Sequence, residues 1–235
     1  MAHEKQMTII EHLEELRGRL IKCLVALVVA TAFSMTFTSQ ILRILIEPAG
    51  IKPVFLRPTE MFLTYFRVAL LAGVTLAMPV IVYQAVQFVW PGLKGNERTY
   101  LGLIVPAATI SFLVGVSFTY FVMLPYALRY LLSFGGDLVE AKWAIGEYVS
   151  FVTTLLFWAG VVFETPLILF FLARLRVITP QFLSQNRKFA VLIIAVIAAV
   201  ITPTPDPFNM GLVMGPLLLM YEIGILLARL AYRLT

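Results

Sequence analysis

A chain of 235 residues is long enough for one or two soluble domains, but its composition excludes a water-soluble globular protein. Hydrophobic residues make up 60% of it and charged residues 13%, against about 45–50% and about 25% in soluble domains. The net charge of +5 comes with no basic cluster that is interleaved with aromatic residues, so we do not expect nucleic acid as a partner. The composition, with a mean hydropathy of +0.93, predicts a membrane protein.

The N-terminal segment predicts an amphipathic helix that leads into the first apolar run. Thr8 and Glu11 match a capping box, and the segment lacks the apolar core of a cleaved signal peptide. Glu11, Glu14 and Glu15 share one face of this helix. Two interpretations stay open. The face is solvated and neutralised by Glu15 and Arg19 at i,i+4, or it accepts a cationic ligand, because a carboxylate takes two parallel N–H bonds from an arginine.

Six apolar runs are predicted to span the membrane as helices. In chain order they cover residues 20–38, 61–89, 100–132, 147–173, 189–201 and 210–230. The fifth run is short, since at 1.5 Å per residue it reaches about 20 Å across a hydrocarbon layer of about 30 Å. The segment 39–60 predicts a short interfacial helix that ends at Pro48. We therefore expect an all-α fold in a single membrane domain, residues 1–235.

The distribution of basic residues predicts the orientation of the chain. With the N-terminus inside the cell, twelve of the 18 Lys and Arg residues lie on the cytoplasmic side and six on the opposite side. The twelve are Lys5, Arg17, Arg19, Lys22, Lys94, Arg98, Arg174, Arg176, Arg187, Lys188, Arg229 and Arg233, and the six are Arg43, Lys52, Arg57, Arg67, Arg129 and Lys142. Because six crossings return the chain to its starting side, we expect both termini in the cytoplasm.

Two acidic residues fall at membrane depth. Glu164 lies inside the fourth predicted span, where burying a carboxylate costs several kcal/mol unless it is protonated, paired or hydrated, and this makes it a candidate functional residue. Alternatively, it hydrogen-bonds backbone groups that Pro166 leaves without partners. Glu222, in the last predicted span, is a second and weaker candidate for a functional acid at membrane depth. One hypothesis for the function is therefore a proton- or ion-coupled transporter of small solutes that uses both acids.

The first cytoplasmic loop, FVWPGLKGNERTYL, carries another acid, Glu97, which either pairs locally with Arg98 or Lys94 or contributes to a ligand site. An intramembrane protease is a third hypothesis, but the chain has no HExxH or GxSxG motif, and both histidines precede the first span. A P-loop is also absent. We therefore expect no enzymatic activity, no cofactor and no metal site.

Several stretches, in one order along the whole chain, resemble a single family. They are EHLEELRGRL, MPVIVYQAVQFVWPGLKGNER, FTYFVMLPYAL, VVFETPLIL, ITPTPD and LLLMYEIGILLARL. In these motifs the chain is similar to TatC, the six-span receptor subunit of the twin-arginine protein translocase. The resemblance implies a concave helical bundle in the cytoplasmic (inner) membrane that exports folded proteins with energy from the proton gradient. It also implies twin-arginine signal peptides as ligands and the single-span proteins TatA and TatB as partners in an oligomeric complex.

The resemblance further implies roles for particular residues. Those expected to bind the signal peptide are Glu15, Leu16, Arg17, Arg19, Phe88, Pro91, Glu97 and Arg98. Glu164 matches an intramembrane acid of the concave pocket, and Pro48 matches a structural proline of the first outer loop. The residues expected to contact a partner subunit lie at the outer end of the fifth span and are Thr202, Thr204, Asp206 and Asn209. The ITPTPDPF turn departs from the family pattern by an extra Thr-Pro step, so the family's motif position aligns with either Thr202 or Thr204.

Overall fold

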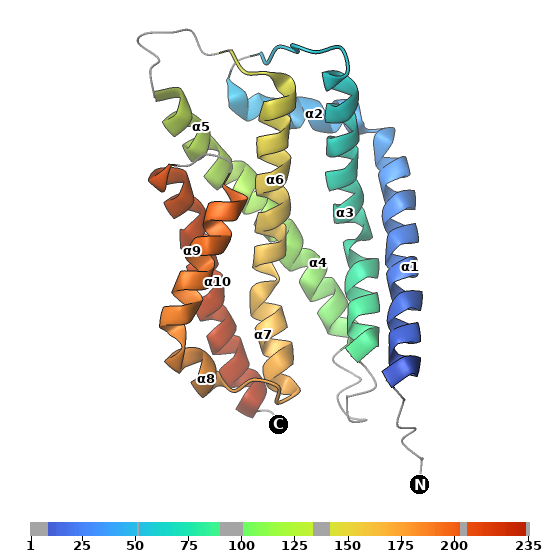
Figure 1. Ribbon diagram of the computed structural model, residues 1–235, viewed down its shortest axis with the longest axis vertical. Coiled ribbons are helices and arrows are strands. Elements are labelled where there is room, and N and C mark those ends of the chain that lie inside the picture. Colours follow the sequence, from blue (N-terminus) through green and yellow to red (C-terminus); the bar gives the residue numbers. More distant parts are fainter. Residues whose placement is uncertain (1–8, 51, 90–100, 134–141, 203–205, 234–235) are drawn as a thin grey trace.

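The computed structural model describes residues 9–50, 52–89, 101–133, 142–202 and 206–233. In these ranges the chain forms helices and one isolated β-bridge, and no strand. The helices are α1 (Ile9–Met35), α2 (Thr38–Ile46), α3 (Glu60–Val89), α4 (Leu101–Phe118), α5 (Leu124–Ser133), α6 (Ile145–Phe163), α7 (Thr165–Arg174), α8 (Pro180–Gln185), α9 (Arg187–Ile201) and α10 (Pro207–Arg233). The predicted all-α fold class is confirmed (Figure 1).

Five segments of the described chain are long and apolar enough to cross a membrane: Ile10–Met35, Glu60–Phe88, Gly102–Ser133, Ile145–Arg174 and Pro207–Arg233. The fifth predicted span corresponds to α9, which is apolar after Arg187 and Lys188 but has 15 residues and therefore reaches only about 22 Å. The first turn of α1 and the last turn of α10 lie at the same end of the molecule (Figure 1).

The long helices form two groups. In one group α1 packs along α3, and α3 contacts α4 and α6. In the other group α10 packs against α7 and α9. Because α7 follows α6 almost end to end, this pair of helices connects the two groups (Figure 1).

Prolines coincide with the two interruptions of the long helices. Pro166 has no N–H to donate, and the helix breaks at Glu164, between α6 and α7. The Ser111 hydroxyl of α4 donates a hydrogen bond of 2.7 Å to the Phe163 carbonyl at this break. The other interruption is a π-helical turn, Thr119–Met123, which joins α4 to α5 just before Pro125. Such irregularities at membrane depth are tolerated where neighbouring helices satisfy the freed backbone groups.

The end of the molecule opposite the two described termini is closed by α2 (Figure 1). Two tyrosine hydroxyls bind the last carbonyls of α2: Tyr120 donates to Ile44 at 2.8 Å and Tyr148 donates to Leu45 at 2.7 Å. Beside α2, the carboxylate of Glu60 accepts backbone N–H groups from Leu56, Arg57 and Gly146, at 2.7, 3.2 and 2.7 Å. These bonds satisfy helix-terminal and loop groups that would otherwise need water.

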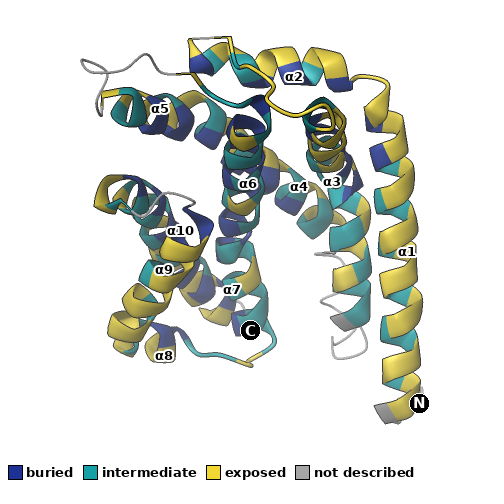
Figure 2. Cartoon of the chain, turned by 45° about the horizontal axis from the view of Figure 1, so that its top comes forward, coloured by how far each residue is buried: buried dark blue, intermediate teal, exposed yellow. Residues whose placement is uncertain are grey.

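Exposed apolar side chains cover much of the outside of the bundle, as on α1, where few residues are buried (Figure 2). Among them are Leu24, Val28 and Phe33, each more than half exposed. In water such a surface would promote aggregation, whereas lipid is as apolar as these side chains. The distribution of exposed side chains therefore agrees with a helical bundle whose sides face lipid.

Candidate functional site

The candidate site lies where the first half of α1 meets the last turns of α3. The two helices approach closely at Gly73 of α3, where an added Cβ atom would lie 2.7 Å from the Cα atom of Thr31. Since no side chain fits between the backbones there, α1 lies directly along α3. This packing brings residues 12–19 of α1 beside Gln84 and Phe88.

Glu15 and Arg19 form an ion pair one helical turn apart on α1. Arg19 donates from Nε to Oε1 of Glu15 at 2.9 Å and from Nη2 to the same oxygen. Its Nη1 lies 3.4 Å from Oε1 of Gln84 on α3, a long and therefore weak hydrogen bond. Because only 19% of each paired side chain is exposed, Arg19 holds the Glu15 carboxylate in one orientation against α3.

The second carboxylate oxygen of Glu15, Oε2, differs from the first in its hydrogen bonding. Oε2 is buried, and no described residue donates a hydrogen bond to it. The Nδ1 atom of His12 lies 3.8 Å from Oε2, beyond hydrogen-bond distance. A buried acceptor without a donor costs about 1–3 kcal/mol, and more when the acceptor is charged. Glu15 can therefore accept a strong donor from a ligand without giving up Arg19.

A stacked pair of aromatic rings lies next to this carboxylate. The imidazole of His12 stacks on the ring of Phe88, with centroids 4.3 Å apart and an angle of 15° between the planes. Phe88 is among the residues expected from the sequence, whereas His12 and Gln84 are not. Their spacing in the sequence could have indicated them, because His12 precedes Glu15 by one helical turn and Gln84 precedes Phe88 by one turn.

The remaining residues expected at the site divide into two sets. Leu16 is half-buried and Arg17 is exposed, both on the helix that carries Glu15. Pro91, Glu97 and Arg98 lie outside the described residues, as does Thr8 of the expected capping box.

Glu164 occupies the break between α6 and α7 with 7% of its surface exposed. Its Oε1 is buried and receives no hydrogen bond from any described residue. The Phe163 carbonyl at this break is instead satisfied by Ser111. Oε1 of Glu164 is therefore available to accept a hydrogen bond.

The other polar residues singled out from the sequence have partners. Glu222 pairs with Arg187 of α9. Asp206 caps α10 by accepting hydrogen bonds from the Asn209 backbone N–H at 2.7 Å and from its side-chain amide at 2.9 Å. The Thr202 hydroxyl donates to the Ala198 carbonyl at 2.7 Å. Thr204 lies outside the described residues.

Pro48 sits in the 3₁₀ turn Glu47–Ala49 that follows α2, and Gly50 ends this turn with a positive φ of 67°. Among the described residues, no group of three or more His, Cys, Asp or Glu side chains lies close enough together to hold a metal ion.

The fold and the site define a multi-span α-helical membrane protein that carries an acidic, partly satisfied acceptor at the end where its described termini lie. Residues 11–216 match the sequence profile of the family described as Sec-independent protein translocase protein (TatC). The chain belongs to the TatC family. It is accordingly a component of a protein translocase and not an enzyme, as expected from its motifs.

Relatives from bacteria and plastids share this similarity over almost the whole chain. The chain is 38% identical to the Sec-independent protein translocase protein TatC of Carboxydothermus hydrogenoformans, covering 96% of this chain and 94% of that protein. It is 37% identical to TatCy of Bacillus subtilis, with coverages of 97% and 91%. Identity to the chloroplastic TATC of Arabidopsis thaliana is 34%, with coverages of 98% and 68%.

A solved structure has the same fold. The crystal structure of a twin-arginine translocase receptor, TatC, superposes with a TM-score of 0.85 at 35% identity, covering 94% of this chain and 99% of that one.

Proposed function

We propose that this chain is the receptor subunit that binds twin-arginine signal peptides, and that Glu15 receives one arginine of the pair. The observation that carries the proposal is the state of the Glu15 carboxylate. One oxygen is held by Arg19, and the other is buried without a hydrogen-bond donor among the described residues. An incoming guanidinium supplies that donor after it displaces the groups that cover Oε2.

Arginine suits this acceptor better than lysine does. The guanidinium is planar, presents its N–H groups as a rigid fork and loses hydration more readily than an ammonium group. Beside Glu15, the His12 ring is stacked on Phe88, and a guanidinium can add to this stack on a ring face that the pair leaves uncovered. By family resemblance Glu97 receives the second arginine, and Leu16, Arg17, Pro91 and Arg98 surround the pair.

The proposed orientation places this site in the cytoplasm. The described ends of α1 and α10 share one end of the molecule (Figure 1), and the positive-inside rule favours that end as cytoplasmic. The chain then lies in the inner membrane with both termini inside, on the side where cargo carries its signal peptide. TatA and TatB are the proposed partners, with contacts at the outer end of α9 through Thr202, Thr204, Asp206 and Asn209.

Binding of a fluorescent signal peptide to the purified chain tests this proposal. Glu15→Gln keeps the size of the side chain and removes its charge, so we expect affinity to fall by about tenfold to a hundredfold, as for the loss of a hydrogen bond to a charged group worth about 1.5–3 kcal/mol. The matched control is Glu14→Gln, which removes the same charge from the neighbouring, exposed position. We expect this control to bind like the wild type.

A peptide with two lysines in place of the arginines provides the second comparison. The wild-type chain should prefer the arginine peptide, and Glu15→Gln should lose most of this preference. A photocrosslinker beside Glu97 should likewise label the arginine peptide and barely label the lysine peptide. Equal binding of both peptides, or equal losses in the two glutamine variants, contradicts the proposed recognition.

A further inference from the structure

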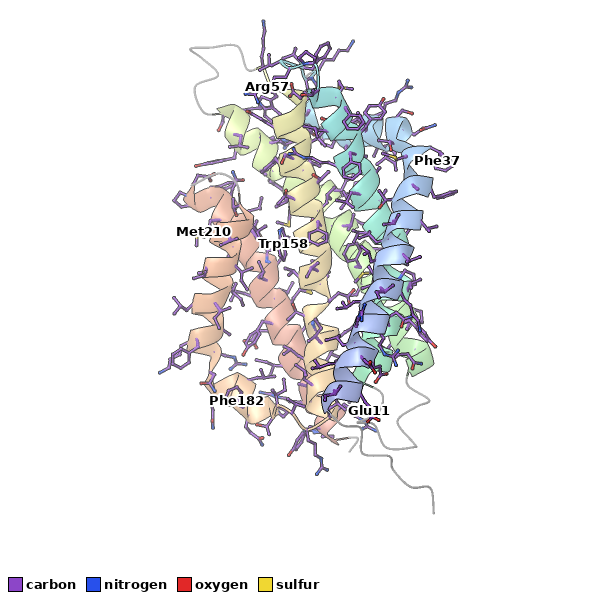
Figure 3. The ribbon with its side chains drawn as sticks, turned by 45° about the vertical axis from the view of Figure 1, so that its right-hand side comes forward. Glu11, Phe37, Arg57, Trp158, Phe182 and Met210 are labelled. Carbon is purple, nitrogen blue, oxygen red and sulfur yellow. The ribbon has the colours of Figure 1, made fainter. Side chains whose placement is uncertain are left out.

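A polar cavity lies at the same end of the molecule as the N-terminus of α1 but in the other helix group. It has a volume of about 570 Å³ between α8 and the last turns of α10. Figure 3 shows Phe182 of α8 at the end that also carries Glu11 of α1. The cavity is lined by Pro180, Gln181, Ser184, Gln185, Arg229, Tyr232 and Arg233.

The charged side chains that line the cavity, Arg229 and Arg233, are both positive. Among the described residues, the lining contains two guanidinium groups and no carboxylate. The chain from residue 165 to its end has only two acids, Asp206 and Glu222. Asp206 caps the far end of α10, and Glu222 is paired with Arg187. The two positive charges of the cavity therefore have no acidic side chain as a partner among the described residues of its walls.

The polar groups of the lining can donate hydrogen bonds. Arg229 donates from Nη2 to the Ser184 hydroxyl at 3.2 Å, which ties α10 to α8. A hydroxyl that accepts this bond keeps its own proton for a second acceptor. Gln181, Gln185 and Tyr232 add further N–H and O–H donors. Two cations and several neutral donors around one space are complementary to the oxygens of a phosphate.

A short apolar strip on α10 adjoins the cavity. It ends one turn before Leu226, at Glu222, which forms the surface ion pair with Arg187. At 100° per residue, Leu226, Arg229, Leu230 and Arg233 fall within about 100° of one another on α10. Leu226 is 60% exposed and Leu230 is 51% exposed. Phe182 of α8, which is 58% exposed, adds another apolar side chain at this end of the molecule. A polar cavity continuous with an apolar strip suits an amphiphile rather than a free ion.

We propose that this cavity binds the phosphate head group of an anionic phospholipid, with Arg229 and Arg233 contacting the phosphate and the acyl chains lying along Leu226 and Leu230. The site is separate from the Glu15 site and does not rest on the signal-peptide proposal. A lipid bound there would attach α8 and the last turns of α10 to the surrounding leaflet, beside α9.

The amount of phospholipid that stays bound to the extracted chain measures this binding. The full chain is reconstituted in phosphatidylcholine vesicles that contain a minor fraction of phosphatidylglycerol, extracted in mild detergent, and its bound lipid is quantified by mass spectrometry. We expect phosphatidylglycerol to be enriched over its share of the bilayer. The double variant Arg229→Gln/Arg233→Gln should lose about tenfold or more of this enrichment, since each basic group near an anionic surface contributes about 1 kcal/mol.

Two further variants separate the cavity from general electrostatics. Arg176→Gln/Lys188→Gln removes two exposed charges that lie outside the lining and should retain the wild-type enrichment. Gln185→Glu places a carboxylate in the lining without deleting an arginine and should reduce the enrichment, even if the double arginine variant does not fold. Unfolding temperatures in phosphatidylcholine alone identify variants that have lost their fold.

Adding inorganic phosphate distinguishes a lipid site from a free-anion site. We expect millimolar phosphate to leave the bound phosphatidylglycerol in place, because phosphate lacks the acyl chains. Displacement by phosphate, equal enrichment in Gln185→Glu and the wild type, or equal losses in the cavity variant and its charge-matched control would overturn the proposal.

Discussion

Arg187 donates two hydrogen bonds to the carboxylate of Glu222, from Nε to Oε1 at 2.7 Å and from Nη2 to Oε2 at 2.8 Å. The pair joins the first turn of α9 to the body of α10 across 35 positions of sequence. Both side chains are 48% exposed, so the pair lies at the surface of the bundle and not in its core. Its parallel, two-bond geometry is the arrangement in which arginine binds carboxylates most strongly.

Reversing either charge of this pair should loosen α9. We expect Arg187→Glu and Glu222→Arg each to lower the unfolding temperature in detergent by a few degrees, because like charges then face each other across the two helices. The double variant Arg187→Glu/Glu222→Arg should recover most of the loss. Lys188→Glu reverses a neighbouring exposed charge, and Glu222→Arg should not rescue it. Absence of recovery in the double variant would show that the pair contributes nothing as a unit.

Tyr148→Phe should destabilise the α2 end of the bundle. The Tyr148 side chain is 3% exposed, and its hydroxyl is the donor to the Leu45 carbonyl at 2.7 Å. Removing the hydroxyl leaves a buried carbonyl unpaired, which costs about 1–3 kcal/mol. Denaturant unfolding in mixed micelles measures the change. Tyr126→Phe, at a 55% exposed position, serves as the control and should stay within about 0.5 kcal/mol of the wild type.

Gly73→Ala should separate α1 from α3 and weaken peptide binding at a distance. The added methyl group would lie 2.7 Å from the Thr31 backbone, so a helix has to move, at a cost of about 1–3 kcal/mol. We expect both the unfolding free energy and the affinity for the twin-arginine peptide to fall, because Gln84 and Phe88 shift relative to Glu15. The control is Gly215→Ala in α10, where an added Cβ meets nothing within 4 Å. A stable Gly73→Ala variant with wild-type affinity would contradict the close approach of the helices.

Glu164→Ala should impair export more than it impairs insertion. The side chain is 7% exposed and has an oxygen without a donor from the described residues, so removing it relieves a desolvation penalty and should not weaken the fold. The amount of membrane-inserted chain and the export of a twin-arginine reporter are measured in the same cells. Glu147→Ala, at an exposed position of α6, is the control. If insertion and export decrease together, Glu164 is a folding residue.

The sequence by itself determined the features that depend on composition and on neighbours within one helical turn. The apolar runs predicted the helices, because lipid requires about twenty apolar residues per span and each span must satisfy its own backbone. The missing N–H of proline marks possible breaks but does not decide them, since the helices are interrupted near Pro125 and Pro166 while Pro79, Pro106 and Pro216 lie inside continuous helices. The pairing of Glu15 with Arg19 follows from i,i+4 spacing.

Only the tertiary structure decided which residues meet across helices. The stacking of His12 on Phe88, the pairing of Arg187 with Glu222 and the bond from Tyr148 to Leu45 join residues separated by 35 to 103 positions. No helical period encodes such contacts, since they depend on how far α1 slides along α3 and on how α2 closes the bundle. The same reason explains why Glu15 could be identified from its sequence motif as a candidate acceptor, while its spare oxygen became apparent only in the folded chain.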